Sequence, residues 1–182
     1  MINVVLVYPE IPNNTGNIVR TRAATGAQLH VIEPCGFSWE DKYLKRSGLD
    51  YWDLATVKRY ENMQAFLKAN FGEKADTDDN VAIAVRKTKE NSKAQFFFAS
   101  TKSAHNFTEV EYEEDCWVFF GRETKGLDEE LLHENYENCV RIPMRAEARS
   151  LNLANSVALF IYEYHRQHGY AGLKEQGKLT KY

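Results

Sequence analysis

The sequence predicts an α/β fold in which a parallel sheet is flanked by helices. Short apolar runs of strand length alternate along the chain with segments whose apolar residues recur at helical spacing. The runs lack a strict alternation of apolar and polar residues, which favours strands that are covered on both faces. A length of 182 residues with 43% hydrophobic content suits one buried core, so we expect a single domain over residues 1–182.

Five apolar runs are expected to form the strands, and helices are expected between them. The strands are predicted at residues 2–8, 28–33, 95–99, 116–120 and 139–142. Helices are predicted at residues 16–25, 41–47, 61–70 and 128–136, each beginning near Thr, Asp, Glu or Asn. The clearest helix covers 152–166, where apolar residues from Leu153 to Tyr164 recur at spacings of three and four and predict one broad apolar stripe.

Two segments depart from this pattern. Residues 72–93 are polar and heavily charged except for the short run VAIAV, so they are interpreted as an insertion that holds either a small extra strand or a mobile loop. Residues 170–182 form a polar, weakly basic C-terminal tail that is expected to fray.

Charge and composition exclude several classes of protein. A formal net charge of −3 argues against a polycation that coats nucleic acid, so any RNA binding needs a local basic patch. No apolar stretch approaches the roughly 20 residues that cross a bilayer, and no secretory leader follows Met1, so a cytoplasmic protein is expected. Cys35, Cys116 and Cys139 show no CxxC spacing, which argues against a disulfide framework and against a metal site.

Two common nucleotide-binding motifs are missing from the sequence. No GxGxxG follows a predicted strand, so a nicotinamide dinucleotide site is unsupported. GRETKG at 121–126 resembles a phosphate loop superficially, but Leu127 and Asp128 stand where such a loop needs Lys and then Ser or Thr.

A first segment of interest, PEIPNNTGNIVR at 9–20, follows a predicted strand at the sheet edge where open parallel sheets bind ligands. Asn14 or Thr15 can cap a helix that begins around Gly16. Arg20 then lies about one turn inside that helix. Taken alone, an ordinary helix start with a solvated arginine is the favoured interpretation.

Two further segments follow strands at the same edge. FFGRETKGL at 119–127 contains glycines that permit positive φ and close approach to a ligand, although alone it is equally a strand-to-helix connection. The third segment joins RIPM at 141–144 to RSLNLANSVA at 149–158. It places Ser150, Asn152 and Asn155 at the head of an apolar helix, where capping accounts for only one of them.

Together, NNTGNIVRT, FFGRETKGL and RIPM followed by RSLNLANSVALFIYE resemble the three ordered motifs of the SpoU branch of the SPOUT methyltransferases. The wider stretch from EIPNNTGNIVRTRAATGAQLHVIEPCGF through GLDYWD is similar to the small tRNA (cytidine/uridine) wobble 2'-O-methyltransferases. The resemblance covers nearly the whole chain except residues 72–93, a region that those small enzymes usually pass with a shorter connection, and the end of the tail.

This resemblance implies a C-terminal deep trefoil knot and a homodimer with the active site at the subunit interface. It implies that S-adenosyl-L-methionine, bound without metal, donates a methyl group to the ribose 2'-hydroxyl of the wobble cytidine or uridine of tRNA, with leucine tRNA as the expected substrate. The alternatives are 2'-O-methylation at another tRNA or ribosomal RNA site, or a knotted RNA-binding factor without catalysis. The intact Arg20 and third motif disfavour that last alternative.

The motif positions imply three groups of site residues. Backbone around the following residues would hold the cofactor: Ala99, Ser100, Thr101, Gly121, Arg122, Glu123, Ile142, Met144, Ser150, Leu151 and Leu153. The residues implied for catalysis are Arg20, Asn14, Glu123, Ser150 and Asn152. RNA is expected to contact Arg20, Lys42, Lys45, Arg46, Arg145 and Arg149.

Arg20 is not expected to act as a general base, because a guanidinium keeps its proton in proteins. A hydrogen bond to the nucleophile or to an RNA phosphate, which would stabilise developing negative charge, is the favoured role. The other implied catalytic side chains would position Arg20 or the ribose. For Tyr162 on the last helix, core packing is favoured over a dimer contact or a site role.

Overall fold

Parallel strands form the centre of the computed structural model, which describes residues 1–40, 42 and 57–181. Among these residues, seven strands make one sheet in the order β3-β2-β1-β6-β4-β7-β5, and all neighbours pair in parallel. The strands are β1 (Ile2–Val7), β2 (Gln28–Ile32), β3 (Val57–Tyr60), β4 (Gln95–Ala99), β5 (His105–Asn106), β6 (Cys116–Phe120) and β7 (Cys139–Arg141). The five predicted strands are confirmed as β1, β2, β4, β6 and β7.

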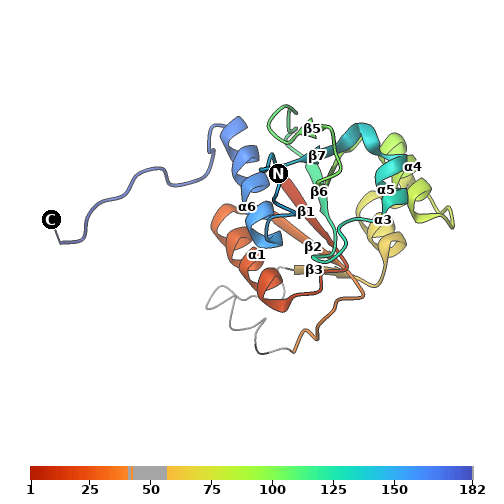
Figure 1. The fold of residues 1–182 in the computed structure, drawn as a ribbon, viewed down its shortest axis with the longest axis horizontal. Helices are drawn as coiled ribbons and strands as arrows, with labels where there is room; N and C mark the ends of the chain where they lie inside the picture. The colour runs from red at the N-terminus through yellow and green to blue at the C-terminus, as the bar shows by residue number, and fades with distance from the viewer. Residues whose placement is uncertain (41, 43–56, 182) are drawn as a thin grey trace.

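Helices cover both faces of the sheet, with α1 and α6 on one side and α3, α4 and α5 on the other (Figure 1). The helices are α1 (Pro12–Thr25), α3 (Met63–Phe71), α4 (Val81–Ser92), α5 (Glu129–Glu134) and α6 (Leu153–Gln167), with short 3-10 turns η3 (Gly72–Lys74) and η4 (Tyr136–Asn138). The helices predicted near α1, α3, α5 and α6 are confirmed. The helix predicted at 41–47 lies outside the described residues, apart from position 42.

The sheet separates two apolar clusters. In β1, Val4 and Leu6 belong to the cluster under α1 and α6, while Val5 belongs to the cluster under α3, α4 and α5. Every residue of β1 is buried. A strand covered on both faces has no polar side to show, which is why the apolar runs of the sequence do not alternate.

Residues 72–93 form neither the extra strand nor the loop that the sequence left open. They contain η3 and the helix α4, which Asn80 caps by accepting hydrogen bonds from the backbone N–H groups of Ala82 and Ile83. Val85 and Thr88 continue the buried face that begins at Ala82. This segment therefore contributes to the core.

The start of α1 also differs from its prediction. The helix begins at Pro12 with Ile11 at the N-cap position, and the Ile11 side chain makes no capping hydrogen bond. Proline is favourable at this position because its missing N–H would have no partner inside the helix. Neither Asn14 nor Thr15 is the cap, and Arg20 lies more than two turns into the helix rather than one.

The order of strands reverses between β1 and β6, which places a topological switch point at the centre of the sheet. Because the strands are parallel, the segments that leave the carboxyl ends of β1, β6 and β7 emerge at one edge. Residues 9–14, 121–127 and 142–152 are those segments. Within the described part of the chain, no helix is long and apolar enough to cross a membrane. The tail beyond Gly172 extends away from the sheet (Figure 1).

Candidate active site

A cavity of about 540 Å³ opens at this edge of the sheet, between the three segments. Asn14 lines it from the first segment, residues 121–127 line it from the second, and residues 149–153 line it from the third. All eleven residues expected to hold a cofactor line this one cavity: Ala99, Ser100, Thr101, Gly121, Arg122, Glu123, Ile142, Met144, Ser150, Leu151 and Leu153. The first and last of these eleven residues, Ala99 and Leu153, are 54 positions apart in the sequence, and the fold brings them to one cavity.

The loop after β6 is held closed by its own backbone. Arg122 and Gly126 exchange two hydrogen bonds, of 3.2 Å from the Arg122 N–H and 2.8 Å from the Gly126 N–H. Gly126 has a φ of 72°, a left-handed conformation that favours glycine. A Cβ on Gly121 would lie 2.0 Å from the carbonyl carbon of Gly126, so no larger residue fits there without opening the loop.

Glu123 supplies the cap that α1 lacks. Its carboxylate accepts hydrogen bonds from the backbone N–H groups of Glu10 at 2.8 Å and Ile11 at 3.2 Å, and from Asn14 Nδ2 at 2.9 Å. A negative charge at a helix N-terminus is stabilised by the helix dipole. This carboxylate therefore joins the loop after β6 to the start of α1.

Asn14 extends this connection to the third segment. Its Oδ1 accepts a hydrogen bond of 2.9 Å from Asn152 Nδ2, and Asn152 Oδ1 in turn accepts from the N–H groups of Ala154 and Asn155. Asn152 is thus the cap of α6, as capping predicted for one of the three polar residues there. Glu123, Asn14 and Asn152 form one chain of hydrogen bonds through all three segments.

A second link runs in the opposite direction. Glu10 Oε2 accepts hydrogen bonds from Thr124 N at 3.1 Å and from Thr124 Oγ1 at 2.7 Å. The hydrogen bond from the Thr124 side chain is the main cause that lowers the pKa of the Glu10 carboxyl. Glu10 is therefore ionised at neutral pH.

The wall of the cavity formed by residues 142–151 has little regular backbone pairing with the rest of the described chain. Among described residues, the one backbone–backbone hydrogen bond within this stretch runs from Ala148 N–H to the Arg145 carbonyl. Leu151 is 41% exposed although it is apolar, and it lines the cavity. Main-chain N–H and C=O groups beside an apolar surface suit a flat, polar-edged ring such as a purine.

The predicted catalytic residues divide into two groups. Asn14, Glu123, Ser150 and Asn152 all line the cavity. Arg20 is exposed on α1 and does not line it. Six helical positions separate Arg20 from Asn14, which corresponds to about 9 Å along the helix axis. Within one chain, the structure does not bring Arg20 to the cavity.

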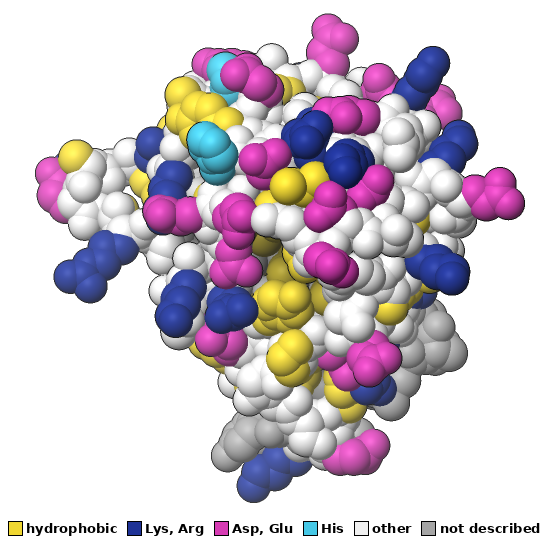
Figure 2. Space-filling view, turned by 90° about the vertical axis from the view of Figure 1, so that its right-hand side faces the viewer, with side chains coloured by type: hydrophobic (Ala, Val, Ile, Leu, Met, Phe, Trp, Pro, Cys, Tyr) yellow, Lys and Arg dark blue, Asp and Glu magenta, His cyan; other side chains and the backbone are white. Residues whose placement is uncertain are grey.

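The expected RNA-binding residues are also divided. Arg149 lines the cavity, and Arg145, Arg20 and Lys42 are exposed. Lys45 and Arg46 lie outside the described residues. On the face formed by α3, α4 and α5, Figure 2 shows cationic and anionic side chains interspersed, with no continuous basic area in its described part.

The prediction that Tyr162 packs in the core is wrong. Its side chain is 49% exposed on α6, as is Leu159 on the same helix at 42%. The apolar stripe that buries Val157, Phe160 and Ile161 faces the sheet, and Tyr162 lies outside that stripe.

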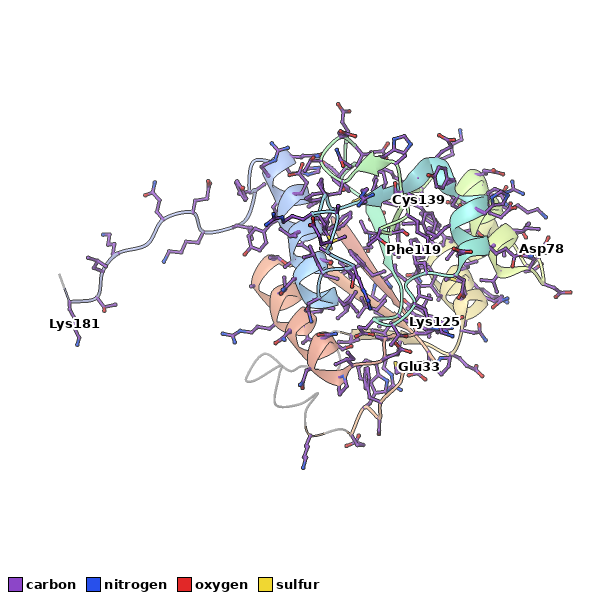
Figure 3. The ribbon with its side chains drawn as sticks, in the orientation of Figure 1. Glu33, Asp78, Phe119, Lys125, Cys139 and Lys181 are labelled. Atoms are coloured by element: carbon purple, nitrogen blue, oxygen red, sulfur yellow. The ribbon has the colours of Figure 1, made fainter. Side chains whose placement is uncertain are left out.

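Sequence reasoning missed several residues of the site. Lys125 lies within the second motif and Lys102 directly follows Thr101, a predicted cofactor residue; neither lysine was predicted for the site, and both line the cavity. Figure 3 shows Lys125 at the edge of the sheet where Glu33 also lies, beyond the end of β2. Lys102 and Lys125 each follow the end of a strand, and that position was the sequence signal that could have identified them. The other lining residues that were not predicted are Ile11, Phe120, Thr124, Gly126, Leu127, Leu132, Val140, Ser156 and Phe160.

A protein family and individual known proteins resemble this chain, and both are RNA methylases. The sequence matches the SpoU rRNA Methylase family over residues 1–162. It is 43% identical over 178 residues to the tRNA (cytidine(34)-2'-O)-methyltransferase of Yersinia pestis, covering 96% of this chain and 100% of that protein.

Two solved structures are similar to the described fold. One, described as concerning the 2-OH methylation of C/U34 on tRNA, has a TM-score of 0.76 and 36% identity and covers 93% of this chain and 97% of its own. The other is an AdoMet-bound rRNA methyltransferase from Sinorhizobium meliloti, with a TM-score of 0.68, 22% identity and coverage of 91% and 56%. At that identity the second likeness concerns the fold alone.

Proposed function

Because the chain belongs to the SpoU methylase family, we propose that it transfers a methyl group from S-adenosyl-L-methionine to the ribose 2'-hydroxyl of nucleotide 34 of tRNA. The expected nucleotide is cytidine or uridine, and the expected substrate is a leucine tRNA. A tRNA substrate also implies a cytoplasmic location. The observation that carries the proposal is the meeting of three motif segments, distant in sequence, around one cavity at the switch point of the sheet.

The cavity fits S-adenosyl-L-methionine by size and chemistry. A volume of about 540 Å³ falls within the range of small-molecule pockets. The main-chain groups around Ile142, Met144 and Leu151 would bind the adenine edge, and Leu151 and Leu153 would contact its faces. When bound, the cofactor supplies a methyl group already activated as a sulfonium, so the protein has to align the reactants and assist loss of a proton.

Arg20 is the proposed catalytic side chain. Since its guanidinium stays protonated, it would donate hydrogen bonds to the 2'-oxygen or to a flanking phosphate as negative charge develops. Asn14, Glu123 and Asn152 would act less directly, because their hydrogen bonds fix the start of α1 and of α6 around the cavity. Ser150 lines the cavity and is exposed, so its hydroxyl can reach a bound ribose.

We also propose a homodimer, which would resolve the separation of Arg20 from the cavity. The helices α1 and α6 lie side by side, and their outer surface carries the exposed apolar side chains of Leu159 and Tyr162. A second copy seated on this surface would bring its own α1 toward the cavity. Sedimentation of wild type and Tyr162→Glu tests this: a monomer in the variant supports it, and a monomeric wild type contradicts it.

We further propose that the chain after β7 is knotted. α6 lies against α1 and β1, whereas the preceding loop lines the cavity together with residues 121–127. Pulling both ends of a single molecule tests the topology. A tightened knot would make the extended chain shorter than about 3.3–3.6 Å per residue, and full extension would exclude it.

Mass spectrometry of nucleosides tests the methyl transfer. Leucine tRNA incubated with protein and S-adenosyl-L-methionine should gain one 2'-O-methyl group at nucleotide 34, and a tRNA with a 2'-deoxyribose there should gain none. Arg20→Ala should lower the single-turnover rate much more than it weakens cofactor binding, because its role is in the transition state. Methylation at another nucleotide would favour a different RNA site, and RNA binding without transfer would favour a non-catalytic factor.

A further inference from the structure

We propose that Glu10 is a positioning residue for methyl transfer: it fastens the loop at 121–127 to the start of α1, the helix whose Arg20 would reach the cavity of the second copy in the proposed homodimer. This inference rests on the proposed function. Glu10 does not itself line the cavity, whereas its partner Thr124 does. Any effect of Glu10 on the reaction must therefore pass through other residues.

The contact between the two segments is reciprocal. Glu10 reaches across to accept two hydrogen bonds from Thr124, at 2.7 and 3.1 Å. Glu123, the neighbour of Thr124, reaches back to accept from the backbone N–H of Glu10 at 2.8 Å. Two carboxylates crossing in opposite directions oppose both sliding and rotation of the loop against the helix start, which a single hydrogen bond would not do.

The backbone at Glu10 is also fixed from the other side. Gly36 N–H donates a hydrogen bond of 2.8 Å to the Pro9 carbonyl. A Cβ on Gly36 would lie 2.8 Å from the Glu10 Cα, so the loop after β2 packs directly against this backbone. With its main chain held, Glu10 has only its side chain left to adjust, and that side chain is bonded to Thr124.

The consequence for the reaction concerns the orientation of α1. Its N-cap residue, Ile11, provides no capping side chain, so the helix start takes its hydrogen bonds from the loop that also lines the cavity. A small rotation at the start of a helix is carried to its later turns, where Arg20 lies. Misplacement of a catalytic group by about 1 Å can lower a rate roughly a hundredfold.

Paired variants test this role. Glu10→Ala should lower the single-turnover rate by about ten- to a hundredfold at saturating tRNA and cofactor, while the affinity for S-adenosyl-L-methionine changes less. Glu10→Gln keeps an acceptor oxygen for Thr124 and should restore most of the rate. The matched control is Glu73→Ala, which removes an exposed glutamate from η3 and should leave the rate unchanged.

A double variant distinguishes positioning from general stability. If Glu10 acts through α1, Glu10→Ala should add little to the defect of Arg20→Ala, because the group being aligned is already missing. Equal loss in both backgrounds, or no loss in the wild-type background, would overturn the proposal while leaving the proposed function intact.

Hydrogen exchange provides a readout that does not need catalysis. Glu10→Ala should speed exchange both at the Thr124 amide and at residues 13–15, on the two sides of the contact. If wild-type protein methylates no tRNA, the proposed function fails, yet this exchange still decides whether the two segments are coupled. Faster exchange on one side alone would contradict the coupling.

Discussion

The side chains of Asn14 and Asn152 meet beside the cavity, where Asn152 Nδ2 donates to Asn14 Oδ1 at 2.9 Å across a separation of 138 residues. The heads of α1 and α6 are thereby joined directly. Asn152 also caps its own helix, so its amide has two separable tasks.

Two substitutions should separate these tasks. Asn152→Ala removes the cap and should lower the free energy of unfolding by about 1 kcal/mol. Asn152→Asp keeps acceptor oxygens for the helix N–H groups but loses the donor to Asn14, so it should retain stability and still weaken cofactor binding. Denaturation and calorimetry measure the two effects. Wild-type cofactor affinity in Asn152→Asp would show that the link to Asn14 does not shape the cavity.

Gly121→Ala should open the loop after β6. The added Cβ would lie 2.1 Å from the Leu127 nitrogen, which is backbone and has little room to move. We expect a loss of about 1–3 kcal/mol in stability, typical of overpacking, and loss of cofactor binding. Gly177→Ala is the matched control, since its Cβ meets nothing within 4 Å. Normal binding by Gly121→Ala would contradict the tight loop geometry.

Leu151→Glu should abolish cofactor binding without unfolding the protein. Leu151 is 41% exposed, so the folded chain tolerates a charge there, whereas a bound cofactor would bury that charge without a partner. Leu179→Glu, in the tail, places the same charge on a side chain that is 75% exposed. Calorimetric titration should show binding for Leu179→Glu only, and binding by both variants would move the cofactor away from Leu151.

Arg145 and Arg149 lie on the exposed segment that borders the cavity. Reversing both charges should weaken tRNA binding and reduce its salt dependence, by roughly 0.7 in the slope of log K against log salt for each RNA phosphate that is no longer neutralised. Cofactor affinity should be nearly unchanged for Arg145→Glu. Lys68→Glu, exposed on α3 at the opposite face, is the control. An equal fall in tRNA affinity for the control would indicate a diffuse charge effect.

His30 should make stability depend on pH. It is fully buried among Tyr60, Phe66 and Trp117, and burial lowers its pKa to about 3. Between pH 3 and about 6.5 the unfolded chain binds a proton that the folded chain does not, so stability falls as pH falls, by about 1.4 kcal/mol per pH unit. His30→Phe should remove this slope in denaturation curves between pH 4 and about 6, and His105→Gln, at an exposed position, should not.

The sequence predicted strands wherever an apolar run was long enough to be buried on both faces. It missed β3, because VKRY buries only Val57 and has the pattern of a charged segment, and β5, which has only two residues. It missed α4 because VAIAV is a short apolar run in a highly charged segment, and the signs of a helix lie outside that run, in the cap at Asn80 and the buried Thr88.

The resemblance indicated which residues lie near the site, but not the hydrogen bonds that join them. The eleven residues that it implied for the cofactor all line one cavity, and their binding role stays a prediction. The bonds of Glu10 to Thr124 and of Glu123 to Glu10 could not be predicted, because they join positions 113 and 114 residues apart and leave no local spacing to detect. The separation of Arg20 from the cavity likewise depends on the path of α1 and on no pattern in the sequence.

The position of β1 in the middle of the sheet has a consequence for biosynthesis. The ribosome makes β1 long before one of its two neighbours, β6, whose register begins with Cys116 opposite Ile2, a separation of 114 residues. Until that segment emerges, the nascent chain presents an apolar strand with one unpaired edge, a feature that attracts chaperones or other chains. The cavity also needs Leu153 and Phe160, so a nascent chain can hold a small molecule there only after residue 160 has been made and has folded.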